Sequence, residues 1–178
     1  MSVHTPQREL EAEAKRIAES LIPELKSRAK MAEDMRQVPK ESVELLRKSG
    51  LLTTVQPATC GGQQMSFRGH VNVMSAIARG CASTAWVLGV WQAHSWMFGH
   101  MDAQAQQDVF GENGELGNQP VAAVIGPRGK AIRHKDGSYT VSGFWPFASG
   151  NAHSTWLLLG CEIFNEVGEK LDDGDVLV

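Results

Sequence analysis

The segment from Ser83 to His100 constrains the fold of this chain more than any other part of the sequence. It has the length of a helix, yet its apolar residues do not form a single stripe. They are Ala85, Trp86, Val87, Leu88, Val90, Trp91, Trp96, Met97 and Phe98. A helix that is apolar on nearly every side is stable in water only when other elements surround it. Because polar residues interrupt this stretch and it is too short to cross a bilayer, we expect a buried helix in the middle of a bundle.

Helical patterns also occur on both sides of this segment. Thr5 is the expected N-cap of a first helix that runs to about Leu25, and Pro23 bends or divides that helix. Apolar residues at helical spacing predict further helices at about 39–49, 67–80 and 102–110. The stretch between residues 49 and 67 carries Pro57 and paired glycines, which are typical of an irregular connection.

The pattern changes to that of strands after Gly117. Short apolar runs at 121–125, 131–134, 139–142, 155–163 and 175–178 indicate strands, and Asp136-Gly137 is a hairpin signal. We expect an α+β chain with an amino-terminal all-α helical domain, residues 1–117, followed by the start of an antiparallel β-barrel domain, residues 118–178. A sheet that stops as its last strand begins leaves edges unpaired, so either a partner segment is missing or this end is poorly ordered.

Composition excludes several classes of function. A net charge of −3 with scattered basic residues provides neither a nucleic-acid surface nor a polybasic membrane anchor. The three cysteines lie far apart, without the spacing of metal ligands, and no export signal precedes them. This indicates free thiols in a reducing cytoplasm and no metal site. The acidic run at 172–175 lacks the distal glutamate of a calcium loop and is predicted to be a solvated turn.

The chain resembles the acyl-CoA dehydrogenase superfamily over nearly its whole length, and three stretches carry the match. They are VPKESVELLRKSGLLTTVQPATCGG (38–62), ARGCASTAWVLGVWQAHSWMFGHMDAQAQQDVFGE (78–112) and GSYTVSGFWPFASGNAHSTWLLLG (137–160). In that family an amino-terminal helical domain precedes a β-barrel and a carboxy-terminal four-helix bundle, and flavin is held between barrel and bundle. The resemblance implies the same order here, with the carboxy-terminal helical bundle absent from these residues.

Two segments resemble one branch of the superfamily in particular. AAVIGPRGKA (122–131) and WPFASG (145–150) stand where dehydrogenases carry Thr-Glu, Gly-Ser-Asp and Trp-Ile-Thr-Asn passages. Both resemble instead the oxygenase components of two-component monooxygenases. The branch implies hydroxylation of a small aromatic or related substrate by O2 through a flavin C4a-hydroperoxide. It also implies reduced FMN or FAD supplied by a separate reductase, and homo-oligomers that are commonly tetramers.

The resemblance assigns cofactor contacts to both segments. Ser149 stands where the family places a hydroxyl beside flavin N5, although a serine before glycine also commonly makes a turn. The remaining predicted cofactor contacts are Val124, Ile125, Trp145, Phe147, Ala148 and Gly150. Apolar residues at 124 and 125 suit a dry flavin pocket and equally suit any barrel core.

The long apolar helix supplies the candidate substrate residues. His94 is the predicted base for a phenol, because imidazole titrates in the right range, and the competing interpretation is a core histidine bonded to a backbone carbonyl. Trp91 is expected to wall the substrate pocket, or else to serve as core packing. His153 faces either the flavin or the barrel surface.

Two other functions are compatible with the sequence. An acyl-CoA dehydrogenase-like flavin oxidoreductase would use a carboxylate base in the missing bundle, which this chain neither supplies nor excludes. A truncated, non-catalytic product is the other alternative. Since relatives hold flavin partly through the carboxy-terminal domain, we expect these residues alone to be inactive.

Overall fold

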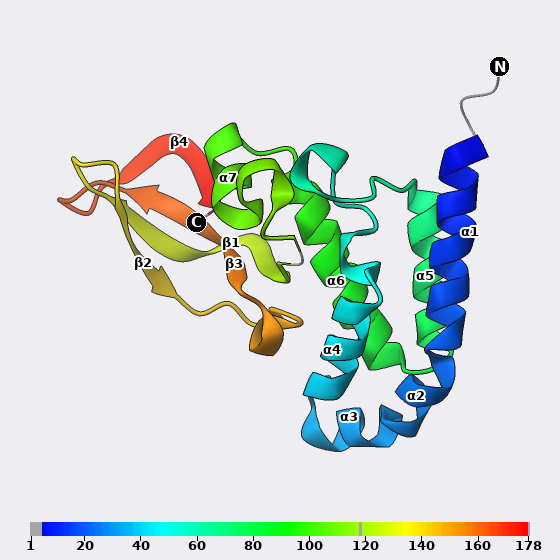
Figure 1. Cartoon of the computed structure of the whole chain (residues 1–178). Helices are drawn as coiled ribbons and strands as arrows, with labels where there is room; N and C mark the ends of the chain where they lie inside the picture. Colours follow the sequence, from blue (N-terminus) through cyan, green and yellow to red (C-terminus); the bar gives the residue numbers. More distant parts are fainter. Residues whose placement is uncertain (1–4, 118, 178) are drawn as a thin grey trace.

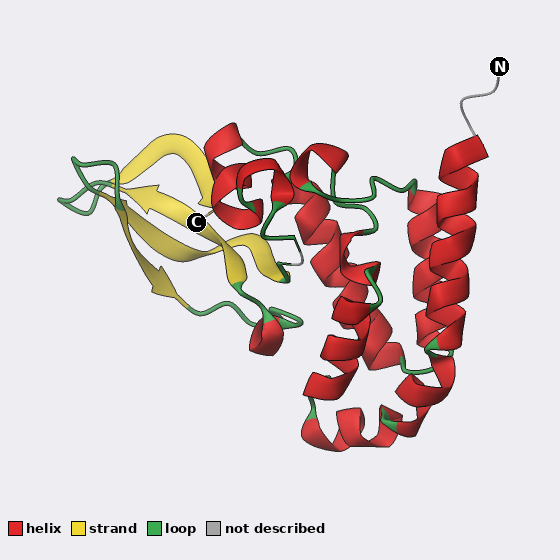
Figure 2. Ribbon diagram, in the orientation of Figure 1, coloured by secondary structure: helices red, strands yellow, loops and turns green. Residues whose placement is uncertain are grey.

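The computed structural model describes residues 5–117 and 119–177, with helices in the first part of the chain and strands in the second (Figures 1 and 2). The helices are α1 (Thr5–Ser20), α2 (Ile22–Ser27), α3 (Ala29–Met35), α4 (Lys40–Lys48), α5 (Phe67–Ala78), α6 (Ala82–Phe98) and α7 (Ala103–Phe110). Short 3₁₀ turns η1 (Leu51–Thr53), η2 (Ala58–Cys60), η3 (Glu112–Gly114) and η4 (Asn151–His153) lie between them or in the later connections. The α+β class expected from the sequence is confirmed.

The first predicted helix is divided, as Pro23 requires. α1 ends at Ser20, and α2 begins after Leu21 with Pro23 in its first turn, where the missing N–H has no helical acceptor to lose. α3 was not predicted, because it is only seven residues long and has no strong apolar period. It ends at Met35, and the C-cap residue Arg36, with a left-handed φ of 52°, turns the chain toward α4.

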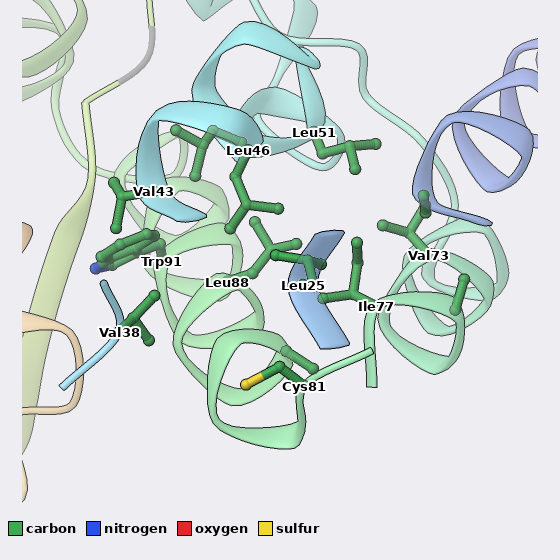
Figure 3. Packing of buried hydrophobic residues seen from close by; sticks show 14 of the residues in the cluster. Leu25, Val38, Val43, Leu46, Leu51, Val73, Ile77, Cys81, Leu88 and Trp91 are labelled. Carbon is green, nitrogen blue, oxygen red and sulfur yellow. The ribbon is translucent and has the colours of Figure 1, made fainter. Parts of the chain in front are cut away.

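α6 lies against α5 and the α3–α4 region and carries the core of the helical part (Figure 3). Leu88 and Trp91 on α6 are buried and belong to the same cluster as Leu25, Leu46 and Ile77. The expectation of a helix surrounded on all sides is only partly correct, since Trp86 is 66% exposed and Trp96 is 39% exposed. One side of α6 therefore faces open space.

The strands form a mixed sheet in the order β2-β1-β3-β4. They are β1 (Val121–Arg133), β2 (Tyr139–Gly143), β3 (Trp156–Phe164) and β4 (Lys170–Leu177). β1–β2 and β3–β4 are antiparallel hairpins, but β1 and β3 run parallel, which differs from the wholly antiparallel sheet that was expected. The reason is the long connection 144–155, which carries the chain from the end of β2 back to the start of β1, so that β3 begins there.

Two further strand predictions are corrected. The runs 121–125 and 131–134 belong to one strand, β1, whose register with β3 shifts between Val124 and Gly129. Residues 172–175 lie in β4 and not in a turn. The turn comes earlier, where the Asn165 side chain accepts hydrogen bonds from the N–H groups of Val167 and Glu169. The predicted last strand residue, Val178, lies outside the described residues.

The helical part and the sheet share a second apolar cluster. Phe98 and Phe110 from α6 and α7 pack edge to face, with centroids 6.2 Å apart, and contact Val121, Ala123 and Leu158 of the sheet. This cluster fixes the start of β1 and β3 against the carboxy-terminal half of α6. No helix among the described residues is both long and apolar enough to span a membrane.

Candidate functional site

A cleft of about 760 Å³ lies between the helical part and the connection that joins β2 to β3. One wall comes from α3 and the residues before α4, and the first two turns of α6 provide another. The third wall is the segment 149–153. Lining residues from these three sources include Arg36, Val38, Trp86, Val87, Ser149 and His153. The predicted WPFASG motif therefore ends in a cleft shared with the long apolar helix.

A tight bend brings Ser149 to this cleft. Phe147 has a φ of 64°, which is rare for a bulky residue and costs on the order of 1–3 kcal/mol. The Ser149 N–H then bonds to the Phe147 carbonyl at 2.8 Å, and the Asn151 N–H bonds to the Ala148 carbonyl at 3.1 Å. Local strain is thus held in place by short hydrogen bonds and turns the Ser149 side chain toward α6.

The Ser149 hydroxyl is left able to donate. Its oxygen accepts a hydrogen bond from the Trp86 indole N–H at 3.1 Å. Within residues 5–117 and 119–177 the hydroxyl donates to no acceptor, so its proton is free for a bound ligand. The Trp86 ring, which also lines the cleft, offers a flat aromatic surface beside this proton.

Trp91 lies behind the bend and not in the cleft. Its side chain is 1% exposed, and its ring nitrogen points away from Leu88 and Leu25 in Figure 3. Gly150, at a φ of 83°, touches this ring so closely that an added Cβ would lie 2.5 Å from the Trp91 Nε1 atom. Glycine is thus required here by both backbone conformation and space.

His94 is placed as a neutral imidazole with one nitrogen available. Its Nδ1 lies 2.9 Å from the Val121 carbonyl oxygen, so this nitrogen must carry the proton and donate it. Burial lowers the pKa of His94 from its ordinary value, and the bond to Val121 opposes that shift. The Nε2 lone pair is therefore the basic site at neutral pH. His94 is eight residues beyond Trp86, about 12 Å along α6, and does not line the cleft.

The other predicted cofactor residues lie on the sheet side of the bend. The Trp145 indole N–H donates to the Gly160 carbonyl at 2.9 Å, and its ring covers Gly129 and Gly143, where the β1 register shifts. Phe147 is 93% exposed and Ile125 is 51% exposed. Val124 and Ala148 are half-buried. Of the predicted contacts, only Ser149 and Gly150 line the cleft.

Two contacts in the cleft were not predicted from the sequence. Trp86 was predicted as an apolar residue of a helix that resembles the monooxygenase branch, but its exposure and its bond to Ser149 were not predicted. His153 bonds through Nε2 to the Val38 carbonyl at 2.7 Å, across the cleft from α6. Neither contact carries a local signal, because the partners are 63 and 115 residues apart. Among the described residues no group of His, Cys, Asp and Glu side chains could hold a metal.

Comparison with known proteins agrees with this architecture. Residues 5–110 match the model of the acyl-CoA dehydrogenase N-terminal domain. The oxygenase subunit HsaA of a flavin-dependent monooxygenase from Rhodococcus jostii (strain RHA1) is 32% identical over 86% of this chain and 39% of that protein. The oxygenase component of an FADH(2)-dependent resorcinol hydroxylase from Rhizobium sp. (strain MTP-10005) is 36% identical over 75% of this chain and 32% of that protein.

Solved structures give the same result. The HsaA monooxygenase from M. tuberculosis superimposes with a TM-score of 0.82 at 30% identity, over 94% of this chain and 44% of that chain. XiaF from Streptomyces sp., solved with FADH2 and glycerol, has the same fold, with a TM-score of 0.88 at 24% identity over 98% of this chain and 43% of that one. The chain spans about 40% of the length of HsaA. It belongs to the acyl-CoA dehydrogenase family, and the relatives that it matches include oxygenase subunits of flavin-dependent monooxygenases.

Proposed function

We propose that these residues are part of the oxygenase component of a two-component flavin-dependent monooxygenase that hydroxylates a small aromatic molecule with O2. The observation that carries the proposal is the Ser149 hydroxyl, presented with a free proton to a cleft beside the Trp86 ring. The relatives named as flavin-dependent oxygenase components support the same reaction class.

The residues around the bend fit a flavin. A reduced flavin, when bound, supplies the electrons and carries oxygen to the substrate. Ser149 is suited to donate a hydrogen bond to the ring, and the exposed Phe147 and Ile125 offer apolar surface that a planar ring system can cover. The other predicted cofactor contacts are Val124, Trp145, Ala148 and Gly150. Such apolar cover excludes water, which protects oxygen transfer from wasteful release of hydrogen peroxide.

His94 supplies the base in this proposal. Its Nδ1–H is committed to the Val121 carbonyl, and its Nε2 lone pair is free to accept the proton of a phenol. Its lowered pKa keeps it unprotonated at neutral pH. Removal of the phenolic proton raises electron density on the ring and so favours attack on an electrophilic oxygen. Trp91, which is buried on the same helix, packs in the core behind the proposed substrate pocket.

The proposal also includes a separate reductase that supplies the reduced flavin, which is either FMN or FAD, and a homo-oligomeric assembly. Titration of the natural full-length polypeptide with FMNH2 and FADH2 decides the flavin, and light scattering decides the assembly.

The reaction is tested with the natural full-length polypeptide that carries these residues, supplied with chemically reduced flavin, ¹⁸O2 and a panel of phenols. We expect O2 uptake that requires both flavin and phenol, and a product that carries one ¹⁸O atom. Reduction of a dye by an acyl-CoA, with no requirement for O2, would instead support the acyl-CoA dehydrogenase-like alternative.

A further inference from the structure

A relay of side chains joins the core of the helical part to the bend. The buried Trp91 indole N–H donates to the Ser154 hydroxyl oxygen at 3.2 Å. The Ser154 hydroxyl in turn donates to the Gly150 carbonyl oxygen at 3.0 Å. One hydroxyl therefore satisfies an indole N–H of the core and a carbonyl of the bend at the same time.

The segment 149–154 is also held from the opposite wall of the cleft. The His153 Nε2–H donates to the Val38 carbonyl at 2.7 Å, and the Gln37 amide lies 3.1 Å from the same nitrogen. Inside the segment, the His153 N–H bonds to the Gly150 carbonyl and the Ser154 N–H bonds to the Asn151 carbonyl, both at 3.1 Å. The segment is thus one rigid turn fixed at two points.

We propose that Ser154 is a positioning residue, which sets the location of the Ser149 hydroxyl through the Trp91–Ser154–Gly150 relay. Gly150 follows Ser149 directly, and its carbonyl is the atom that Ser154 holds. If the carbonyl moves, Ser149 moves with it relative to Trp86, which is fixed on α6. The role of Ser154 in turnover rests on the proposed function, whereas the relay itself is testable without any reaction.

The relay has a physical consequence that an ordinary surface serine lacks. Without the Ser154 hydroxyl, the Trp91 indole N–H loses its acceptor and the Gly150 carbonyl loses one of its donors. Because Trp91 is buried, water does not readily replace the missing hydroxyl. The bend also contains Phe147 in a strained backbone conformation, so loss of these hydrogen bonds allows the backbone to move to a conformation of lower energy. Its relaxation separates Ser149 from Trp86.

The indole N–H resonances of the five tryptophans report on this directly. In a ¹H–¹⁵N spectrum of the uniformly labelled chain, Ser154→Ala is expected to move two peaks. The Trp91 peak moves because its acceptor is gone, and the Trp86 peak moves because Ser149 has shifted. Trp96, which makes ring contacts with Phe67 and His100 instead, stays in place. Ser154→Thr keeps the hydroxyl and restores both peaks.

Ser138→Ala is the matched control, because the Ser138 side chain bonds to Asp136 within its own hairpin and to no other described residue. It should move neither the Trp86 nor the Trp91 peak. If Ser154→Ala shifts Trp91 and leaves Trp86 at its wild-type position, the proposal is wrong. Ser154→Cys keeps the shape of the side chain with a somewhat larger terminal atom and weakens the hydrogen bonds. It provides the same comparison if the alanine variant does not fold, with a smaller shift expected.

Turnover by the natural full-length polypeptide is the second readout. Because a misplacement of about 1 Å can lower a rate by roughly 100-fold, we expect Ser154→Ala to lower product formation by about tenfold or more, with an increased share of O2 released as hydrogen peroxide. The substrate KM should change little, and Ser154→Thr should recover the coupling. Equal coupling in Ser154→Ala and Ser138→Ala would overturn the role in turnover. Absence of any flavin-dependent O2 uptake in the wild type would instead overturn the proposed function, and the tryptophan peaks would still decide the relay.

Discussion

Replacing Gly150 with alanine adds one methyl group at the point where the bend meets the core. The change has two physical effects. An alanine at a φ of 83° adopts a left-handed conformation, which costs about 1–2 kcal/mol. Its Cβ would also lie 2.5 Å from the Trp91 Nε1 atom and 3.0 Å from a Val87 methyl, and overpacking of this kind costs roughly 1–3 kcal/mol. Together they predict a loss of about 2–5 kcal/mol in the free energy of unfolding.

Gly137→Ala separates these two effects. Gly137 has a φ of 87°, but an added Cβ would meet nothing within 4 Å, so only the backbone term applies. The change in entropy of the unfolded chain is the same for both substitutions and cancels in the comparison. Urea denaturation followed by tryptophan fluorescence measures each free energy of unfolding. We expect Gly150→Ala to be less stable than Gly137→Ala by about 1–3 kcal/mol.

The comparison also has a clear negative outcome. If the two variants agree within about 0.5 kcal/mol, the contact between Gly150 and the Trp91 ring does not constrain the bend. In that case packing of the bend against α6 does not set the position of Ser149.

The remaining predictions concern charge and chemistry. Glu11 is buried beside α5, where the Ser66 hydroxyl at 2.5 Å and the Arg68 guanidinium lower its pKa. Glu11→Gln should therefore lower the free energy of unfolding at pH 7, measured by urea denaturation, by about 1.5–3 kcal/mol. The stability from Glu11 is present above its ordinary pKa of 4.5 and is lost as pH falls through the lowered value, so wild type and variant should converge in acid. Burial also lowers the pKa values of His94 and His70 from 6.5. Their neutral forms are therefore favoured in the folded state, and the free energy of unfolding is highest above pH 6.5 and declines below it. Unchanged urea midpoints between pH 7.5 and 5.5 would contradict this. Ser149→Ala should raise the share of O2 that the full-length enzyme releases as hydrogen peroxide. His94→Ala should impair product formation more than flavin binding. Equal effects of His94→Ala on product formation and on flavin binding would contradict a role for His94 at the substrate.

The sequence alone determined the features that depend on neighbouring residues. The helical spacing of Leu10, Ala14 and Ile17, the proline at 23 and the apolar run of α6 predict helices to within a few residues, because helix formation is governed by contacts within a turn or two. The WPFASG stretch likewise indicated the family branch without any coordinates. Local pattern also placed the change from helices to strands near Gly117.

Tertiary structure alone decided which distant residues meet. The parallel pairing of β1 with β3 depends on the route of residues 144–155, and no local pattern encodes that route. Trp86 differs from Trp91 only because one side of α6 is left open, so that one indole bonds to Ser149 in the cleft and the other is buried under Gly150. The position of the Ser149 hydroxyl is set by packing and hydrogen bonds between segments about 60 residues apart, and such contacts exist only once the chain has folded.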